Sequence, residues 1–198
     1  MAVVDPLHED EFDPDLLTEV QFFKGPLGVI PNSVRTMAHH PAIALAFTNL
    51  NKAVMTSHGA VTPEFKRLLG YVTSQTSGCR YCQAHMILAS ERFGASEERL
   101  NAVFDFQDSP HFTEAEKAAL AFGHAASHVP NGVTEEIVAN LKVHWSDPDI
   151  VEIMGVVALF GYLNRWNDSM GSALEDLPIS AGEKYLKASI GWDVGKHV

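Results

Sequence analysis

Apolar side chains recur along this chain at the three- and four-residue spacing of α-helices. The clearest examples are Ile43, Leu45, Ala46, Leu50 and Val54, followed by Phe65, Leu68, Leu69 and Val72. This spacing places the apolar residues on one face of a helix, where they can pack against a core. No pair of alternating strands joined by a hairpin turn is visible. The sequence therefore predicts an all-α fold.

Capping residues, prolines and glycines mark where these helices begin and end. A proline lies in the first turn at four predicted starts, at Pro41 itself and after Asp13, Thr62 and Asp147, and glycines follow several predicted ends. Residues 25–32 hold two prolines and two glycines and are predicted to form a loop. Capping boxes are expected at Thr113 with Glu116 and at Ser180 with Glu183. The predicted helices cover roughly residues 14–23, 41–58, 63–76, 79–93, 96–104, 113–128, 134–145 and 147–170, with a last one after 180.

Composition and charge narrow the class of protein. The chain has 198 residues, of which 46% are hydrophobic, enough for a sizeable core. Its formal net charge of −11 argues against a nucleic-acid partner. The first residues carry acids and no basic signal region, and the apolar stretch 150–163 is short and interrupted by Glu152. We therefore expect a cytoplasmic protein without a membrane partner.

Two cysteines, Cys79 and Cys82, are the only ones in the chain, and just Arg80 and Tyr81 separate them. A structural disulfide stabilises mainly by closing a long loop, and this loop is very short. The pair therefore indicates redox or metal chemistry. Two other interpretations remain open: an inert buried pair, and a zinc site completed by His85 with His58 or His124.

Thiol reactivity depends on forming the thiolate, and several groups near the pair favour that charge. Cys79 lies at a predicted helix start, where free backbone N–H groups favour an anion. Arg80 and Arg67 add positive charge. His85 lies three residues after Cys82, on the same helix face. The histidine spacing favours Cys82 as the activated thiol and the helix start favours Cys79, so the sequence leaves both assignments open.

The stretch from residue 78 to 85 resembles the signature of the alkylhydroperoxidase D/carboxymuconolactone decarboxylase family. Residues 27–32 and 112–120 extend the resemblance, and residues 164–168 are similar to the subgroup described as peroxidase-related. The resemblance implies one compact, multi-helix AhpD-like domain over residues 1–198, with a helical extension over about 1–40. It also implies homo-oligomers, often trimers or hexamers, with no organic cofactor and no metal.

The resemblance further implies a thiol-dependent peroxidase or disulfide reductase of the antioxidant type. In the family pattern the second cysteine, here Cys82, attacks a small-molecule peroxide and becomes a sulfenic acid. The first, here Cys79, then resolves it to a disulfide, with His85 in a proton relay. An unidentified thiol reductant would restore the dithiol by thiol–disulfide exchange.

Two positions depart from the family pattern. The family usually has its histidine four residues after the second cysteine, and here His85 follows Cys82 by three. The family has a relay glutamate twelve residues before the first cysteine, where this chain has Arg67. Glu64 and Asp168 are the candidates to replace that acid. Tyr81 is expected either to supply a hydrogen-bonding hydroxyl or to pack in the core.

Two alternatives of other classes are kept beside the peroxidase hypothesis. One is a non-enzymatic oligomeric module that binds a ligand or metal and senses redox state through Cys79 and Cys82. The other is a cofactor-free lactone decarboxylase, whose chemistry does not depend on the cysteine pair.

Overall fold

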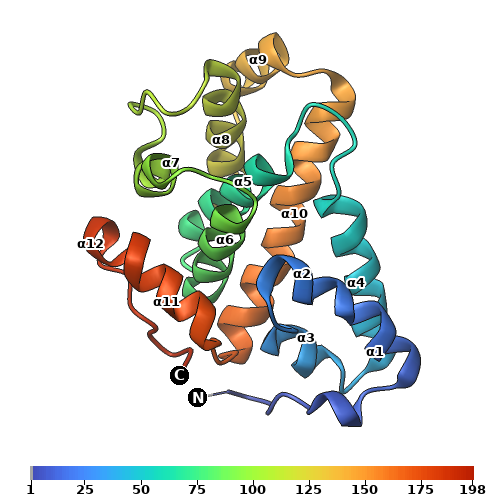
Figure 1. The fold of residues 1–198 in the computed structure, drawn as a ribbon. Coiled ribbons are helices and arrows are strands. Elements are labelled where there is room, and N and C mark those ends of the chain that lie inside the picture. Colours follow the sequence, from blue (N-terminus) through green and yellow to red (C-terminus); the bar gives the residue numbers. More distant parts are fainter. Residues whose placement is uncertain (1) are drawn as a thin grey trace.

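The computed structural model describes residues 2–198, so residue 1 of the predicted N-terminal extension lies outside the described part (Figure 1). Within residues 2–198 the regular structure is helical throughout, which confirms the all-α prediction. The α-helices are α1 (Pro14–Val20), α2 (Lys24–Leu27), α3 (Asn32–Met37), α4 (Pro41–Met55), α5 (Pro63–Thr76), α6 (Arg80–Arg92), α7 (Glu97–Ala102), α8 (Glu114–Ala126), α9 (Glu135–His144), α10 (Asp147–Met170), α11 (Asp176–Tyr185) and α12 (Lys187–Ile190). Short 3-10 turns occur at Glu9–Glu11, Gln21–Phe23 and Val103–Asp105.

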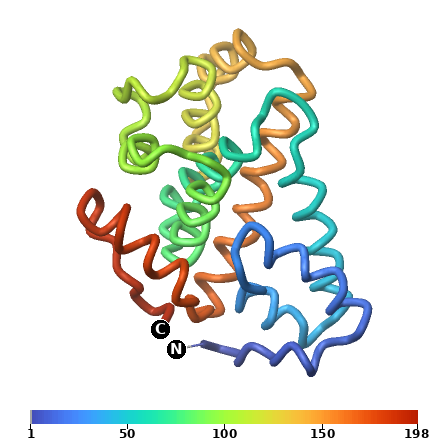
Figure 2. Tube along the Cα trace, viewed as in Figure 1, coloured from blue at the N-terminus to red at the C-terminus, as the bar shows by residue number. Residues whose placement is uncertain are grey.

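Helix α6 lies at the centre of the packing. Its most extensive contact is with α5, while α11 and α10 also pack against it. Figure 1 shows the long helix α10 running past α5 and α6, with α4 on its other side. Figure 2 shows that the two ends of the chain lie at the same end of the molecule. One continuous apolar core, which includes Leu68, Ile87 and Phe160, joins these helices.

A tight turn between α5 and α6 sets the position of the cysteine pair. Gly78 has a φ of +76°, a backbone conformation that residues with a side chain rarely adopt. The Cys79 backbone N–H donates to the carbonyl of Ser74, 3.1 Å away, and Cys79 is the N-cap residue of α6. The start of α6, and with it both cysteines, is thereby fixed in the interior.

The prediction of a loop over residues 25–32 is wrong in part. Residues Lys24–Leu27 form α2, which ends at Gly28 with a φ of +79°. Pro26 is compatible with so short a helix because the first-turn N–H that it lacks would have no partner inside the helix. Helix α3, which the sequence pattern did not reveal, follows and buries Val34 and Met37.

The predicted capping box of Ser180 with Glu183 is also wrong. Helix α11 begins one turn earlier, at Asp176, with Glu175 as its N-cap residue. The Ser180 hydroxyl lies inside this helix and donates to the Asp176 carbonyl at 2.9 Å. Serine forms this kind of back-bond within helices as well as caps at their starts, so its position alone does not identify a helix start. The earlier start places Glu175 against α6.

Within residues 2–198, no helix combines the length and the apolar character that a bilayer crossing requires.

Candidate active site

A cavity of about 60 Å³ opens beside the cysteine pair. Its lining is mostly apolar and includes four phenylalanines, Phe22, Phe23, Phe47 and Phe160. Polar groups reach it at few points, among them Cys82, His85, Asn167 and Arg67. An apolar cavity with a few convergent polar groups is the usual form of a small-molecule site.

The two cysteines take different places relative to this cavity. Both are free thiols and both are buried. Both belong to the apolar core, but Cys82 lines the cavity and Cys79 does not. The Asn167 amide Nδ2 donates to Cys82 Sγ at 3.3 Å. The sulfur that a bound molecule would meet is therefore that of Cys82.

The pKa shifts of the two thiols, in contrast, favour Cys79 as the sulfur that carries the negative charge. A hydrogen bond from the Cys82 thiol lowers the pKa of Cys79; burial opposes this, and the backbone N–H groups of Cys82 and Tyr81 at the start of α6 add to the lowering. Burial raises the pKa of Cys82 well above its ordinary value, and the neighbouring Cys79 raises it further. These directions make Cys79, the residue at the helix start, the more acidic thiol of the pair.

His85 has partners at both ring nitrogens. Its Nδ1 lies 3.0 Å from the Tyr81 carbonyl oxygen, which can only accept, so Nδ1 carries a hydrogen. Its Nε2 forms an ion pair with Glu175 Oε2 at 2.9 Å, although the two atoms are not aligned as in a regular hydrogen bond. The hydrogen-bond partners of Cys82 in the described chain are Cys79 and Asn167. His85 thus faces the same cavity as Cys82, and its two nitrogens are paired with Tyr81 and Glu175 rather than with the Cys82 sulfur.

Glu175 is the acid that the structure brings to His85, and sequence reasoning missed it. Its Oε1 accepts hydrogen bonds from the Asn32 backbone N–H at 2.5 Å and from the Tyr81 hydroxyl at 3.2 Å. Burial alone would raise the pKa of Glu175, but the positive charge of His85 and the backbone hydrogen bonds outweigh it, so the pKa is lowered. The sequence signal available was slight: an acid just before a helix start, with no indication of which histidine it reaches.

Tyr81 both packs in the core and uses its hydroxyl. The ring stacks on His85 at 4.3 Å between centroids. The hydroxyl accepts from the Ser33 backbone N–H at 3.2 Å and donates to Glu175. Burial, followed by the charge of Glu175, raises the pKa of Tyr81 well above its ordinary value, so the hydroxyl remains a donor.

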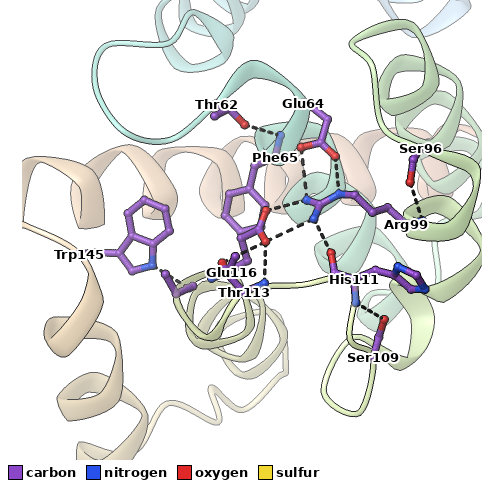
Figure 3. A network of polar contacts seen from close by, with 11 residues as sticks. Thr62, Glu64, Phe65, Ser96, Arg99, Ser109, His111, Thr113, Glu116 and Trp145 are labelled. Carbon is purple, nitrogen blue, oxygen red and sulfur yellow. Dashed lines mark hydrogen bonds and ion pairs between the residues drawn. The ribbon is translucent and has the colours of Figure 1, made fainter.

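Glu64, proposed from the sequence as a replacement relay acid, is held elsewhere. Its Oε1 accepts from Arg99 Nε at 2.9 Å, and Arg99 also pairs with Glu116 at 2.6 Å. Figure 3 shows Arg99 between the two carboxylates, with the Thr113 cap of α8 beside them. This network joins α5, α7 and α8 and leaves the Glu64 carboxylate no part in the contacts of His85.

Asp168 does not reach His85 either. Its side chain is 46% exposed and forms an ion pair with Lys196 at 2.9 Å. It lies on α10 one residue after Asn167, which points inward and is 1% exposed. Neighbouring positions on a helix face different directions, so the block 164–168 contributes its amide rather than its acid to the cysteine site.

Arg67 reaches the cavity from α5. Its Nη1 donates to the Pro63 carbonyl at 2.7 Å and to the Met55 carbonyl at 3.3 Å. Its guanidinium lies 3.8 Å from the centre of the Phe93 ring. Burial lowers the pKa of Arg67 to about 10, so the group stays positively charged at neutral pH.

In the part of the chain that the structure describes, no group of three or more His, Cys, Asp or Glu side chains is assembled around a common point where a metal ion could bind. His58 Nε2 contacts the Ala53 carbonyl, and His124 contacts Thr76 and His128, away from the cysteine pair.

Comparison with known proteins identifies the family. The sequence model of the carboxymuconolactone decarboxylase family matches residues 41–125. A cysteine-to-alanine variant of the debrominase Bmp8, solved in complex with 2,3,4-tribromopyrrole, is 31% identical over 93% of this chain and 98% of its own, with a TM-score of 0.88. This chain belongs to the carboxymuconolactone decarboxylase family. The resemblance of residues 78–85 to that family is thereby confirmed.

A less similar solved structure shares the fold. An uncharacterised peroxidase-related protein with an alkylhydroperoxidase AhpD core, from Ralstonia eutropha JMP134, is 20% identical over 89% of this chain and 94% of its own, with a TM-score of 0.78. The uncharacterised protein YnjA of Escherichia coli K12 is 28% identical over 109 residues, 54% of this chain. That match spans 59% of YnjA, less than two thirds of its length.

Proposed function

We propose that this protein is a thiol-dependent oxidoreductase that reduces a small, largely apolar electrophile by two electrons. The observation that carries the proposal is the placement of the pair: Cys82 lines an apolar cavity, and Cys79, outside the lining, interacts with the Cys82 thiol. A substrate in the cavity meets one sulfur, and the second sulfur is within reach to form a disulfide. The cysteine pair is then both the reductant and the means of releasing the product.

An organic hydroperoxide is the first candidate substrate. The Cys82 sulfur attacks the terminal oxygen, the O–O bond breaks, and the alkoxide leaves and takes up a proton. Cys82 becomes a sulfenic acid; Cys79 then attacks its sulfur, water leaves, and the disulfide forms. A dithiol reductant returns two electrons by thiol–disulfide exchange.

The contacts around the pair support this order of events. The thiolate forms first on Cys79, because its pKa is lowered. Transfer of the Cys82 proton along their shared hydrogen bond moves the charge to Cys82, where the Asn167 amide stabilises it. His85 and Glu175 supply the proton for the leaving group. Since both nitrogens of His85 have partners at rest, the His85–Glu175 contact must open before that proton enters the cavity.

Reductive removal of bromine from an aromatic ring is the second candidate. The similarity to the debrominase Bmp8 over nearly the whole chain favours it, as does the phenylalanine lining of the cavity. In this reaction the carbon–bromine bond breaks, the ring gains a proton, bromide leaves, and the Cys79–Cys82 dithiol is oxidised to the disulfide. The same two sulfurs and the same cavity serve both candidates.

Stopped-flow oxidation of the reduced protein tests the proposal and separates the candidates. Cumene hydroperoxide and a polybrominated pyrrole are the two oxidants. We expect Cys82→Ser to abolish turnover, and Cys79→Ser to stop after one event; with the hydroperoxide, dimedone traps the sulfenic acid at Cys82. Full turnover by Cys82→Ser would contradict the proposal. Lactone decarboxylation that is unchanged in the Cys79→Ser, Cys82→Ser double variant would support the alternative of a cofactor-free lactone decarboxylase. Oxidation of the thiols without repeated turnover would favour a redox sensor.

Self-association into trimers or hexamers and a cytoplasmic location remain predictions. Light scattering coupled to size-exclusion chromatography measures the molar mass and tests the first.

A further inference from the structure

Arg67 places a positive charge in the active-site cavity without a negative partner. The residue is 4% exposed, and the cavity lining contains no Asp or Glu. Among the described residues no carboxylate pairs with it: burial alone accounts for its lowered pKa. A buried charge that lacks a partner is costly and therefore rare in folded proteins. The protein as a whole carries a net charge of −11, whereas this cavity is lined by a cation and by no acidic residue.

Most hydrogen-bonding capacity of this guanidinium is unused. A guanidinium has five N–H groups, and the two on Nη1 are directed at the Pro63 and Met55 carbonyls. Neither Nε nor Nη2 has a protein partner in residues 2–198. These are the donors that bind a carboxylate side by side through two parallel hydrogen bonds. Arg67 is thus equipped to hold an anionic group that the chain itself does not supply.

A purely structural role explains Arg67 only in part. Its Nη1 does satisfy a carbonyl at the end of α4, where positive charge is favourable. Lys66 already donates to the Val54 and Thr56 carbonyls at the same helix end, at 2.5 and 2.6 Å. Lys66 has a carboxylate partner, Glu152 at 2.5 Å, whereas Arg67 has none. Lys66 therefore has both carbonyl and carboxylate partners, whereas Arg67 has carbonyl partners and no carboxylate.

The charge of Arg67 is not directed at the reactive thiol. The groups that act most on the pKa of Cys82 are its own burial, Cys79, Asn167 and Asp168. Along α6 the cavity wall runs from Cys82 past Met86 to Ala89, two turns or about 10 Å. Arg67 lies near the far end of this wall, over Phe93 one turn beyond Ala89. An apolar stretch separates the sulfur from the cation.

We propose that the cavity binds an organic anion, an apolar ring or short chain that bears one carboxylate or similarly acidic group. The anionic group lies on Nε and Nη2 of Arg67, and the apolar body extends along Met86 toward Cys82. A volume of about 60 Å³ holds roughly five waters on a scale of about 10–15 Å³ each, and so accepts one small ring. That this anion is also the substrate rests on the proposed function; that it binds does not.

Benzoate and benzamide test this inference, because they have nearly the same shape and differ in charge. Isothermal titration calorimetry gives the Kd of each for the reduced wild type, Arg67→Gln, Arg67→Lys and Arg165→Gln. We expect the wild type to prefer benzoate by about tenfold or more, as hydrogen bonds between charged groups allow. Arg67→Gln should lose the preference and Arg67→Lys should keep part of it. Arg165→Gln, which removes an equal charge from an exposed position outside the cavity, should retain it.

Alkylation of Cys82 locates the bound anion. In a Cys79→Ser background, benzoate should slow the reaction of Cys82 with iodoacetamide more than benzamide does, and Arg67→Lys should weaken this protection. If Arg67→Gln does not fold by circular dichroism, the comparison of Arg67→Lys with the wild type decides. Equal binding of the two probes by the wild type, or a benzoate preference unchanged in Arg67→Lys and Arg67→Gln, would overturn the inference. Hydroperoxide turnover without an anion preference would overturn this inference and leave the proposed function standing. An anion preference without any turnover would support this inference and contradict the proposed function.

Discussion

His85 Nε2 lies 2.9 Å from Glu175 Oε2, in a contact that joins the helix of the cysteine pair to the start of α11. The same carboxylate is held by the Asn32 backbone and the Tyr81 hydroxyl. Asn32 belongs to a sequence block that resembles the family, whereas Glu175 lies outside every such block. Where the resemblance implies a relay glutamate this chain has Arg67, on α5, and the acid beside the histidine comes instead from the start of α11.

Glu175→Gln should slow the oxidation of Cys82 about a hundredfold, since proton transfer by a positioned group typically contributes at least that much. The amide keeps the shape of the side chain and removes the charge that attracts the His85 proton. Stopped-flow rates with cumene hydroperoxide between pH 5 and 9 measure the effect. Glu64→Gln is the matched control: because Glu64 pairs with Arg99, its rate should stay within about twofold of wild type. Equal losses in both variants would contradict the assignment of Glu175.

The same contact should stabilise the fold only where Glu175 is ionised. Its pKa is lowered in the folded protein, so as the pH falls the unfolded chain binds the proton first. The stabilisation is therefore present above the ordinary pKa of a glutamate and is lost as the pH falls through the folded-state value. Urea unfolding should show Glu175→Gln less stable than wild type by about 1–3 kcal/mol at pH 7. The difference should shrink in acid; a difference that stays constant down to pH 3 would count against this.

Titration of the thiols should find Cys79 the more acidic sulfur. The largest cause of its lowered pKa is the hydrogen bond from Cys82, which a serine can still donate and an alanine cannot. Thiolate absorbance should therefore rise at lower pH in Cys82→Ser than in Cys82→Ala. Cys79→Ser, which leaves only the buried Cys82, should titrate at the highest pH of the three. A Cys79→Ser protein that titrates first would reverse the assignment.

Gly70→Ala should destabilise the core beside the cavity. A Cβ at position 70 would lie 2.7 Å from Cε2 of Phe160, a ring that is itself buried and cannot easily move. Overpacking of this kind costs about 1–3 kcal/mol, measured as a lower urea midpoint with an unchanged slope. Gly25→Ala is the control: a Cβ at position 25 would have no other atom within 4 Å, and alanine is favoured in the helix it occupies. Its unfolding free energy should stay equal or rise slightly.

Much of the helical architecture could be read from the chain because its signals act within one turn. Thr62 caps α5 and Thr113 forms its capping box with Glu116, both at the predicted places. Hydrogen bonds of this kind link residues three apart and are independent of the rest of the fold. Helices α2 and α3 were missed because they are short and their stability comes from burial against other elements.

At the site, the groups that share one helix could be placed from the order of residues alone. Cys79, Cys82 and His85 follow one another at intervals of three residues at the start of α6, and this spacing fixes their relative positions on the helix. The groups that meet them from other elements were settled by tertiary packing: Asn167 from α10, Glu175 from the start of α11 and Arg67 from α5. Several acids were available along the chain, and the packing of α11 on α6 selected Glu175. Contacts between helices depend on how whole faces pack against each other, and no local pattern of residues encodes that.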